Sequence, residues 1–391
     1  MHLYSLGLAD ILITGITFLT QILIVRHFIA QRKKLSPFVA RLLTGILCVL
    51  CATYLFATPF RFPRLNRIFA WTPVTLRSVL IATGNIWGTA AVVSFAIYLA
   101  VRSFASRQKP AHSPERRKLI QAAGTLAVAA PFAAAAFGGI VERTKFRVKE
   151  IDLPIPSLHP DLVGLRIGQL SDLHVSPWLS VAEAGRAVDM LNEMKPNLIV
   201  VTGDVITQPG DPLDAAIREL GRLRADAGVL GSLGNHERYI RCEGYETAEA
   251  ARYGIDILRN RARQLRWGNG VLNVAGVDYQ SIREGPYLGG FEELVVPGAA
   301  NLLLSHNPDV FPTAVRKGYD AVLSGHTHGG QVTVEILNQA LNVARFATPY
   351  VSGLYRLDGR SCYVTAGIGT IAIPVRLGAP PEITVVRLIR A

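Results

Sequence analysis

The stretch Ala321-Val322-Leu323-Ser324-Gly325-His326-Thr327-His328-Gly329-Gly330 joins a short apolar run to a pair of histidines and a pair of glycines. An apolar run of this length, followed by turn residues, predicts a buried strand. Alternate residues of an extended chain face the same side, so His326 and His328 can both reach one ion. Two imidazoles ahead of two glycines have no evident role in a core. The stretch therefore predicts a metal site at the end of a strand.

Four other segments repeat the arrangement of an apolar run followed by Asp, Asn or His. They are Ser171-Asp172-Leu173-His174, Gly203-Asp204, Gly234-Asn235-His236-Glu237 and Ser305-His306-Asn307. Each has a plainer interpretation alone, because Gly-Asp is a common turn and Gly-Asn-His-Glu can cap a helix. Together with the first stretch they hold five of the nine histidines of the chain. An α/β-type sheet gathers the residues at its strand ends into one cleft, and the five segments predict such a cleft.

The donor atoms of these segments indicate which ions the cleft would bind. Neutral imidazole, carboxylate and amide oxygen together suit divalent Mn, Fe, Zn or Co. No cysteine lies near the segments, which argues against a structural zinc site of the cysteine type. Asp204, at a strand end, can bridge two ions, and two ions ~3.5–4 Å apart can clamp a phosphate and activate a shared water. A histidine beside the ions can then protonate the leaving oxygen.

The ordered set Asp-X-His, Gly-Asp, Gly-Asn-His-Glu, a later single His and Gly-His-Thr-His resembles the calcineurin-like metallophosphoesterase superfamily over about 165–335. The resemblance implies an α/β (α+β) four-layer fold, a double β-sandwich flanked by helices, with two metal ions between the sheets. It implies that His236 is the proton donor and not a ligand. It also implies two ligand sets that share Asp204: Asp172, His174 and His328 on one ion, and Asn235, His306 and His326 on the other.

The first part of the chain has a different composition. Four apolar stretches, at about 3–25, 38–60, 74–101 and 119–140, are each long enough to span a bilayer. Residues 1–150 contain 19 Lys and Arg against 4 Asp and Glu, whereas the remainder contains 22 against 25. The net charge of +12 therefore belongs to the apolar part, where it indicates membrane topology and not a nucleic-acid partner.

Basic residues gather in the first and third connections between these stretches, which predicts that both are cytoplasmic. Everything after about residue 140 would then lie outside the cytoplasm, beside an inner or plasma membrane. Arg116-Arg117-Lys118-Leu119-Ile120 resembles a twin-arginine export signal, although an ordinary basic end of a membrane helix is the alternative. A twin-arginine-like anchor followed by tail segments such as 350–355 and 374–382 resembles a membrane-associated branch of the family. Members of that branch hydrolyse phosphoesters, and some of them act on lipids or lipid-linked sugars. The three further spans of this chain depart from that branch.

These observations predict a transmembrane region of about four helices at 1–141 and a metallophosphoesterase domain at 145–391. The expected function is hydrolysis of a phosphoester by a metal-bridging hydroxide, with His236 as general acid. A phosphodiester is the favoured substrate, and a lipid or lipid-linked one is favoured among these. The alternative is a membrane sensor or scaffold whose metal domain binds a ligand or partner without turnover.

Three smaller features carry expectations of their own. Cys242 and Cys362 could form a disulfide. The basic stretch 252–266 predicts a solvated helix face, with contact to anionic headgroups as its alternative. Three arginines of the C-terminal loops could grip a distal phosphate: Arg345, Arg356 and Arg376.

Overall fold

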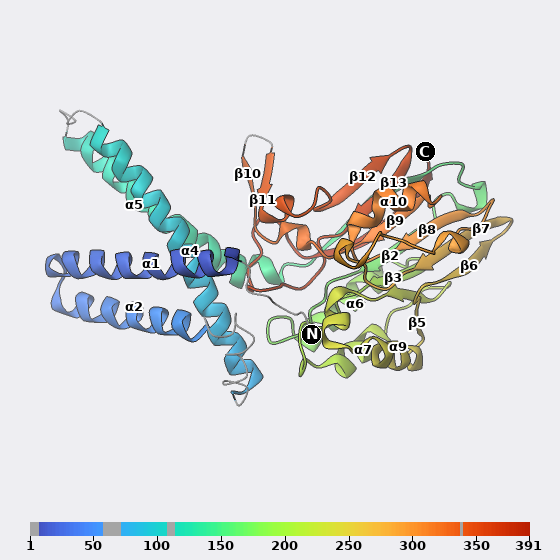
Figure 1. The fold of residues 1–391 in the computed structure, drawn as a ribbon, viewed down its shortest axis with the longest axis horizontal. Helices are drawn as coiled ribbons and strands as arrows, with labels where there is room; N and C mark the ends of the chain where they lie inside the picture. Colours follow the sequence, from blue (N-terminus) through green and yellow to red (C-terminus); the bar gives the residue numbers. More distant parts are fainter. Residues whose placement is uncertain (1–7, 58–71, 108–113, 337–338) are drawn as a thin grey trace. The chain divides into compact units, whose positions relative to one another are not determined.

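The computed structural model describes residues 8–57, 72–107, 114–336 and 339–391. The chain divides into two compact units, Met1–Gly139 and Ile140–Ala391. Figure 1 shows the first as long helices and the second as strands with shorter helices.

Long helices make up the described part of the first unit. They are α1 (Leu8–Gln31), α2 (Pro37–Ala57), α4 (Val74–Arg107) and α5 (Pro114–Ile140), with the short 3₁₀ turn η1 (Arg32–Lys34) after α1. By length and composition four segments could cross a membrane: Leu12–Ala30, Pro37–Ala57, Thr75–Phe104 and Lys118–Thr144. They coincide with the four predicted stretches, although positions 3–7 and 58–60 of those stretches lie outside the described residues.

The surface of these helices is apolar, as expected of helices that face lipid. Val49 is 62% exposed and Leu126 is 72% exposed, although both side chains are purely apolar. Between the helices, contacts are close and partly polar. A Cβ added at Gly88 would lie 2.8 Å from the ring of Tyr54, and the indole of Trp87 donates a hydrogen bond to Gln21 (2.5 Å). Small residues and buried amide contacts are how membrane helices associate without a hydrophobic driving force.

The second unit contains two six-stranded sheets. Sheet 1 has the order β1-β14-β2-β3-β4-β5 and sheet 2 the order β12-β13-β9-β8-β7-β6. The strands of sheet 1 are β1 (Arg147–Ile155), β2 (Arg166–Leu170), β3 (Leu198–Thr202), β4 (Val229–Ser232), β5 (Ile255–Ile257) and β14 (Glu382–Arg390). Those of sheet 2 are β6 (Arg261–Trp267), β7 (Gly270–Gly276), β8 (Ala300–Leu304), β9 (Ala321–Ser324), β12 (Gly353–Leu357) and β13 (Arg360–Val364). A separate hairpin consists of β10 (Thr333–Ile336) and β11 (Gln339–Asn342).

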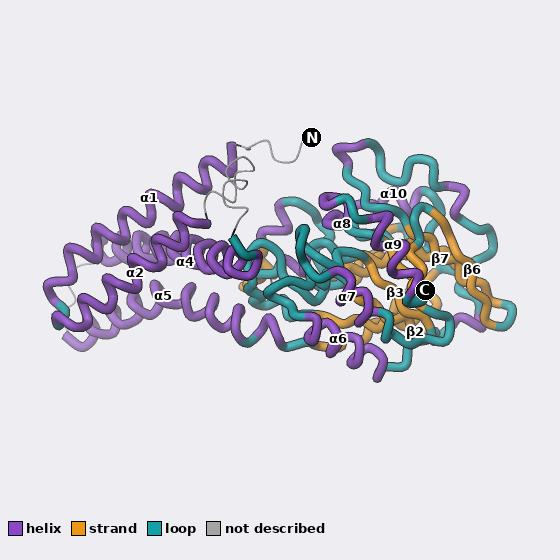
Figure 2. The backbone as a smooth tube through the Cα atoms, turned by 90° about the horizontal axis from the view of Figure 1, so that it is seen from below, coloured by secondary structure: helices purple, strands orange, loops and turns teal. Residues whose placement is uncertain are grey.

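Helices and 3₁₀ turns connect the strands. The helices are α6 (Val181–Glu193), α7 (Leu213–Leu220), α8 (Asn235–Ile240), α9 (Glu243–Arg252) and α10 (Phe311–Arg316). The 3₁₀ turns are η4 (Glu142–Thr144), η5 (Pro160–Leu162), η6 (Ile282–Glu284), η7 (Glu292–Leu294), η8 (Pro308–Val310), η9 (His328–Gly330) and η10 (Val343–Phe346). Figure 2 shows the strands together in the interior of this unit, with helices on its outside.

The alternation of side chains along buried strands creates four layers. In β3, Leu198 and Val200 join the core between the sheets, whereas Ile199 and Val201 join a second core with α6, α7 and α9. In β8, Leu302 and Leu304 face the core between the sheets, and Leu303 packs with Phe311 of α10 in a third core. Both faces of these strands are covered, which is why the sequence shows continuous apolar runs instead of alternation. The predicted double β-sandwich flanked by helices is confirmed.

The basic stretch 252–266 is not a helix face. From Arg261 to Trp267 it forms β6, an antiparallel edge strand of sheet 2. Arg261 and Arg263 both lie beside Asp256, at the end of sheet 1. Charged side chains on an edge strand discourage pairing with other chains, so the residues have a structural role that the local charge pattern did not reveal.

Candidate metal centre

The candidate ligands lie at the carboxyl ends of parallel strands. Asp172 and His174 follow β2, and Asp204 follows β3. Asn235, the first residue of α8, follows β4. In sheet 2, β8 leads into His306 and β9 leads into His326 and His328. Strands β2, β3 and β4 are mutually parallel, as are β8 and β9, so within each sheet these ends lie at one edge.

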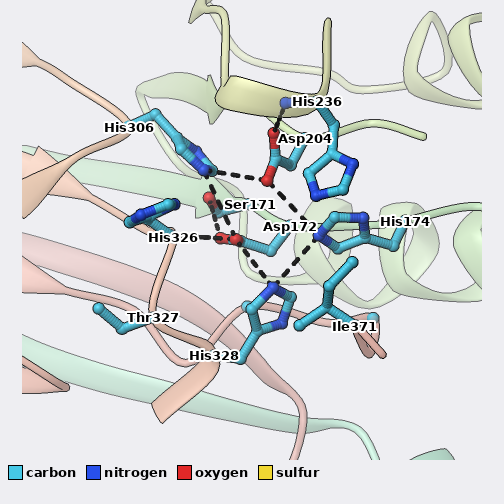
Figure 3. Close-up of polar contacts among 12 residues, drawn as sticks. Ser171, Asp172, His174, Asp204, His236, His306, His326, Thr327, His328 and Ile371 are labelled. Atoms are coloured by element: carbon cyan, nitrogen blue, oxygen red, sulfur yellow. Dashed lines mark hydrogen bonds and ion pairs between the residues drawn. The ribbon is translucent and has the colours of Figure 1, made fainter. Parts of the chain in front are cut away.

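The two sheets bring these side chains into overlapping groups. Each group has ligand atoms within 4.8 Å of one another: Asp172 with His174 and His328, His174 with Asp204 and His236, and Asp204 with His306 and His326. Figure 3 shows both carboxylates in the middle of the cluster, with histidines arranged around them. The Nε2 atoms of His174 and His328 are 3.2 Å apart. Histidines from strand ends more than 150 positions apart in sequence thus face each other.

The outer nitrogens of three histidine rings are engaged by Thr residues. Nδ1 of His174 contacts the Thr207 hydroxyl (3.0 Å), Nδ1 of His236 contacts the Thr207 carbonyl (2.6 Å), and Nδ1 of His306 contacts the Thr202 carbonyl (2.7 Å). A carbonyl oxygen only accepts, so Nδ1 of His236 and of His306 carries the proton. This leaves Nε2 of each ring as the atom available to an ion or a substrate.

The carboxylates are fixed by backbone and hydroxyl donors. Asp172 accepts from the Ser171 hydroxyl (2.6 Å) and from the His326 amide (3.0 Å). Asp204 accepts from the His236 amide (2.9 Å). The neighbouring glycines leave the room these carboxylates need, because a Cβ at Gly325 or at Gly234 would lie 2.1 Å from an oxygen of Asp172 or Asp204, respectively. The glycines of both motifs are therefore part of the site.

Five candidate ligands adopt a left-handed backbone, which costs energy for residues with a side chain. The φ angles are 51° at Asp172, 48° at His174, 55° at Asp204, 75° at His326 and 52° at His328. Such conformations cost about 1–3 kcal/mol each and persist where the surrounding structure enforces them, as at functional sites. Their concentration here indicates that the strand ends are shaped for the positions of the side chains.

Glu237 is a supporting residue, and the sequence analysis gave it no role beyond the helix cap that its segment can form. Its buried carboxylate accepts from the amides of Asp204 (3.0 Å), Val205 (2.8 Å) and Gly234 (2.7 Å). It thereby joins the loop after β3 to the loop after β4. Burial, and then the nearby Asp204 charge, raises its pKa to about 7. The signal for this role was its position as the last residue of the Gly-Asn-His-Glu segment.

Arg376 does not grip a phosphate, because its side chain is completely buried. Its guanidinium donates to the carbonyls of Ala366 (2.9 Å), Gly367 (3.1 Å), Gly369 (2.6 Å) and Ala379 (2.9 Å). Residue Gly369 in turn donates its amide to the Asp172 carbonyl (2.7 Å). Arg376 therefore holds the loop behind Asp172. Arg345 and Arg356, the other two arginines considered, are exposed.

The protonation states of the cluster favour cations. Burial holds the pKa of His174 and of His328 well below the usual range and lowers that of His326 to about 4, so these rings are neutral. Burial also opposes protonation of His306, but Asp204 and Asp172 outweigh it and raise its pKa to about 10. Burial opposes ionisation of Asp204 as well, yet His306 and His174 hold its pKa well below the usual range. Three neutral imidazoles beside an ionised carboxylate suit a metal ion, whereas His306 must lose a proton before it can bind one.

Unpartnered atoms give a second test of whether metal ions fit this cluster. Oδ1 of Asn235 and Nε2 of His306 are buried and make no aligned hydrogen bond, although Nε2 of His306 lies 3.1 Å from Asp204. Buried polar atoms without partners are costly and call for an explanation. A divalent ion is a partner for both atoms, so the residues present fit the group that the motifs imply.

A cavity of about 490 Å³ lies beside the cluster. Gly234, Arg238, Asn260 and Tyr279 are among its lining residues. The ring of Tyr279 lies 5.6 Å from that of His326 and 6.2 Å from that of His306. The cavity thus adjoins the candidate ligands on the side of sheet 2, where part of a substrate could fit. Sequence reasoning did not find Tyr279, which belongs to no motif.

The two cysteines considered for a disulfide are both free thiols. Cys242 precedes α9, and its pKa is raised to about 12 by burial and by the nearby Glu246 carboxylate. Cys362 is buried in β13. The disulfide interpretation is wrong because Cys242 lies between α8 and α9, whereas Cys362 lies in β13 of sheet 2 and packs in the core with α10.

Comparison with known proteins agrees with this geometry. Residues 165–330 match the family model described as calcineurin-like phosphoesterase. The chain is 32% identical over 257 residues to a zebrafish (Danio rerio) "Transmembrane protein with metallophosphoesterase domain", covering 61% of this chain and 56% of that protein. It is 30% identical to metallophosphoesterase YkuE of Bacillus subtilis, covering 64% of this chain and 86% of that protein. It is also 30% identical to phosphodiesterase YaeI of Escherichia coli, covering 56% and 80%.

The chain therefore spans about half of the length of the zebrafish relative and most of the length of the two bacterial ones. The four candidate membrane helices and the relative with a transmembrane name both indicate a membrane protein. The matched residues lie in the second unit and include all five predicted segments. The chain thus belongs to the calcineurin-like metallophosphoesterases, and its second unit carries the metal-dependent phosphoester hydrolase domain of that family.

Proposed function

We propose that this protein is a membrane-anchored phosphodiesterase, in which residues 1–141 form the membrane region and residues 145–391 the catalytic domain. The observation that carries the proposal is the position of Asp204, whose carboxylate belongs to two of the three ligand groups. Two ions would share it. Asp172, His174 and His328 would complete one set, and Asn235, His306 and His326 the other. Ions bound there would supply Lewis-acid activation of water and neutralise charge on the phosphoryl group.

The residues of the chain have distinct parts in this proposal. Thr207 engages Nδ1 of His236, so Nε2 is free to give a proton to the leaving oxygen. The half-buried position of His236 at the rim of the cluster suits a group that meets substrate. The cavity beside Tyr279 would take the part of the substrate that lies beyond the phosphate.

The substrate that we propose is a lipid or lipid-linked phosphodiester outside the cytoplasm. Its support is the anchoring of the domain by apolar helices and the basic residues of the first and third connections. A sensor without turnover would be favoured by a missing ligand or acid. The cleft keeps all seven candidate ligands and His236, which argues against that alternative.

The proposal is tested with the full chain purified in detergent and supplied with Mn. We expect hydrolysis of an aryl phosphodiester at a higher kcat/KM than of the matching monoester, and about two metal ions per chain by elemental analysis. Absence of turnover together with absence of metal would contradict the function. For the substrate, lipid extracts from cells with and without the gene are compared, and we expect one phosphorylated lipid species to accumulate without it.

A further inference from the structure

An exposed apolar patch projects from the second unit on the hairpin β10–β11 and the following turn η10. Its side chains are large and apolar: Val334 (47% exposed), Leu341 (51%), Val343 (78%) and Phe346 (93%). Figure 1 shows the hairpin standing apart from the two sheets. A two-stranded hairpin is marginally stable by itself, and clustered apolar groups on a surface mark contact with a protein or a membrane.

The hairpin is joined directly to the loop that carries the candidate ligands. It begins five residues after His328, and the Thr333 hydroxyl donates to the Gly329 carbonyl (2.9 Å). On its other strand, Asn342 packs against the backbone of Gly330, where an added Cβ would lie 2.6 Å from Cγ of Asn342. The apolar patch is therefore continuous with the loop that carries His326 and His328.

The same face contains the junction where the chain arrives from the last candidate membrane span. That span, Lys118–Thr144, includes Glu142, and the Glu142 carboxylate accepts from the Gly378 amide (3.1 Å). The adjacent Leu377 pairs with Val332, which precedes the hairpin. Helix α5 ends at Ile140, two residues before Glu142, a separation of at most about 7 Å along the chain. Within the second unit, the residues that follow α5 are therefore linked to the hairpin through Gly378, Leu377 and Val332.

Three basic residues and one acidic residue line a cavity between this junction and the hairpin, and Nζ of Lys149 lies 3.7 Å from the Glu382 carboxylate. The cavity has a volume of about 590 Å³ and is lined by Arg147 and Lys149 of β1 and by Arg345 of η10, with Glu382 as an acidic lining residue. Arg147 and Lys149 are two positions apart on an extended strand, so they point to the same side. Basic groups beside apolar ones match a bilayer surface, where anionic headgroups lie above acyl chains.

We propose that this face docks on an anionic lipid surface. Val343 and Phe346 would enter the acyl region, while headgroup phosphates would contact Arg147, Lys149 and Arg345. Docking would hold the metal loop at the bilayer and present the catalytic cleft to groups that protrude from it. The inference goes beyond the proposed function, because lipid contact does not require that the substrate be a lipid.

The test uses the full chain in vesicles whose lipids carry brominated acyl chains, which quench nearby tryptophan. Phe346→Trp places a reporter in the patch. The matched control is Val163→Trp, because Val163 is also apolar and 50% exposed. The next residue, Gly164, donates its amide to the Leu388 carbonyl. Leu388 lies near the end of β14, whereas Glu382 of the cavity lies at its beginning. Native tryptophans are common to all samples, so spectra are taken as differences from wild type. Thermal melting confirms that each variant is folded.

We expect most of the added emission of the Phe346→Trp variant to be lost in brominated vesicles, and that of Val163→Trp to be retained. Equal retention in both would overturn the proposal and assign the patch to another occupant, such as a second copy or the helices of the first unit. The charge component is tested with Arg147→Glu combined with Arg345→Glu, against the exposed control Arg356→Glu. We expect only the double variant to reduce quenching in phosphatidylglycerol vesicles, and unchanged quenching would contradict the headgroup contacts. Neither readout depends on hydrolysis, so the proposed function can fail independently.

Discussion

The two sheets of the second unit make different contributions to the candidate metal centre. Sheet 1 supplies both carboxylates, Asp172 and Asp204, together with His174 and Asn235. Sheet 2 supplies imidazoles: His306, His326 and His328. The negative charge of the site therefore comes from one sheet, and most of its imidazole donors come from the other.

Because of this division, each proposed ligand set depends on closure of the sandwich. Asp172 and His174 need His328 from across the interface, and Asp204 needs His306 and His326. The core between the sheets, with Val200 of β3 against residues of β8 and β9, holds the two edges in register. Metal binding should consequently stabilise the contact between sheets, since a ligand that binds only the folded state adds to its stability.

The largest effect should follow from the carboxylate that both sets share. Asp204→Asn removes its charge but keeps its shape. We expect kcat/KM to fall by ~10³-fold or more, since metal-derived charge stabilisation is worth several kcal/mol, and bound metal to fall below two per chain. The exposed Asp226→Asn is the control. Full activity with normal metal content in Asp204→Asn would remove the bridging role.

The next effect concerns His236, which lies in α8 after β4 of sheet 1 and has no assigned ion in the proposal. His236→Asn should lower kcat by ~10²–10⁴-fold, the usual contribution of a general acid, while metal content stays unchanged. The loss should be smaller for a nitrophenyl ester than for an alkyl ester, because nitrophenolate leaves without a proton. Loss of metal instead would make His236 a ligand, an arrangement that its group with His174 and Asp204 permits.

A smaller effect is expected behind sheet 1, where Arg376 supports the loop at Asp172. Arg376→Lys would leave several carbonyls without donors, at a cost of about 3 kcal/mol. For a domain of this size that corresponds to a fall of about 6–12 °C in apparent Tm, measured by thermal melting against the exposed control Arg356→Lys. An unchanged Tm would show that water can replace the guanidinium.

The smallest effect concerns the proton of His306, which follows β8 of sheet 2. The pKa of His306 is raised to about 10 without metal, so the ring is protonated at pH 7, whereas a ligand must be neutral. Metal binding at pH 7 should release about one proton, and affinity should rise ~10-fold per pH unit until about pH 9. Calorimetry in buffers of different ionisation enthalpy measures this release. His306→Gln should abolish it, and the same release from that variant would point to another group.

Much of the candidate site could be predicted because its chemistry is local. Asp-X-His and His-X-His bring donors to one side of an extended segment, whatever the rest of the chain does. The glycines could be seen but not explained, since the 2.1 Å approach to Asp172 and Asp204 appears only when the loops are folded. Arg376 was misinterpreted for a related reason, because an arginine in a loop gives no local sign that carbonyls enclose it.

The stretch 252–266 shows the limit for the fold. Its arginines fit a helix by charge alone, but pairing of Arg261–Trp267 with β7 decided for a strand. Edge strands with polar faces carry weak periodic signals, and their partners are set by tertiary contacts.

The donor types, the order of the strand ends and the four apolar helices could all be derived from the sequence, since they depend on neighbouring residues and on the length needed to cross a bilayer. Contacts made only in the folded chain settled which donors meet, how Glu237 and Arg376 support them, and that an apolar hairpin extends from the metal loop. Proximity and burial arise from contacts between segments far apart in the chain, and those contacts also set which groups of the cluster carry charge.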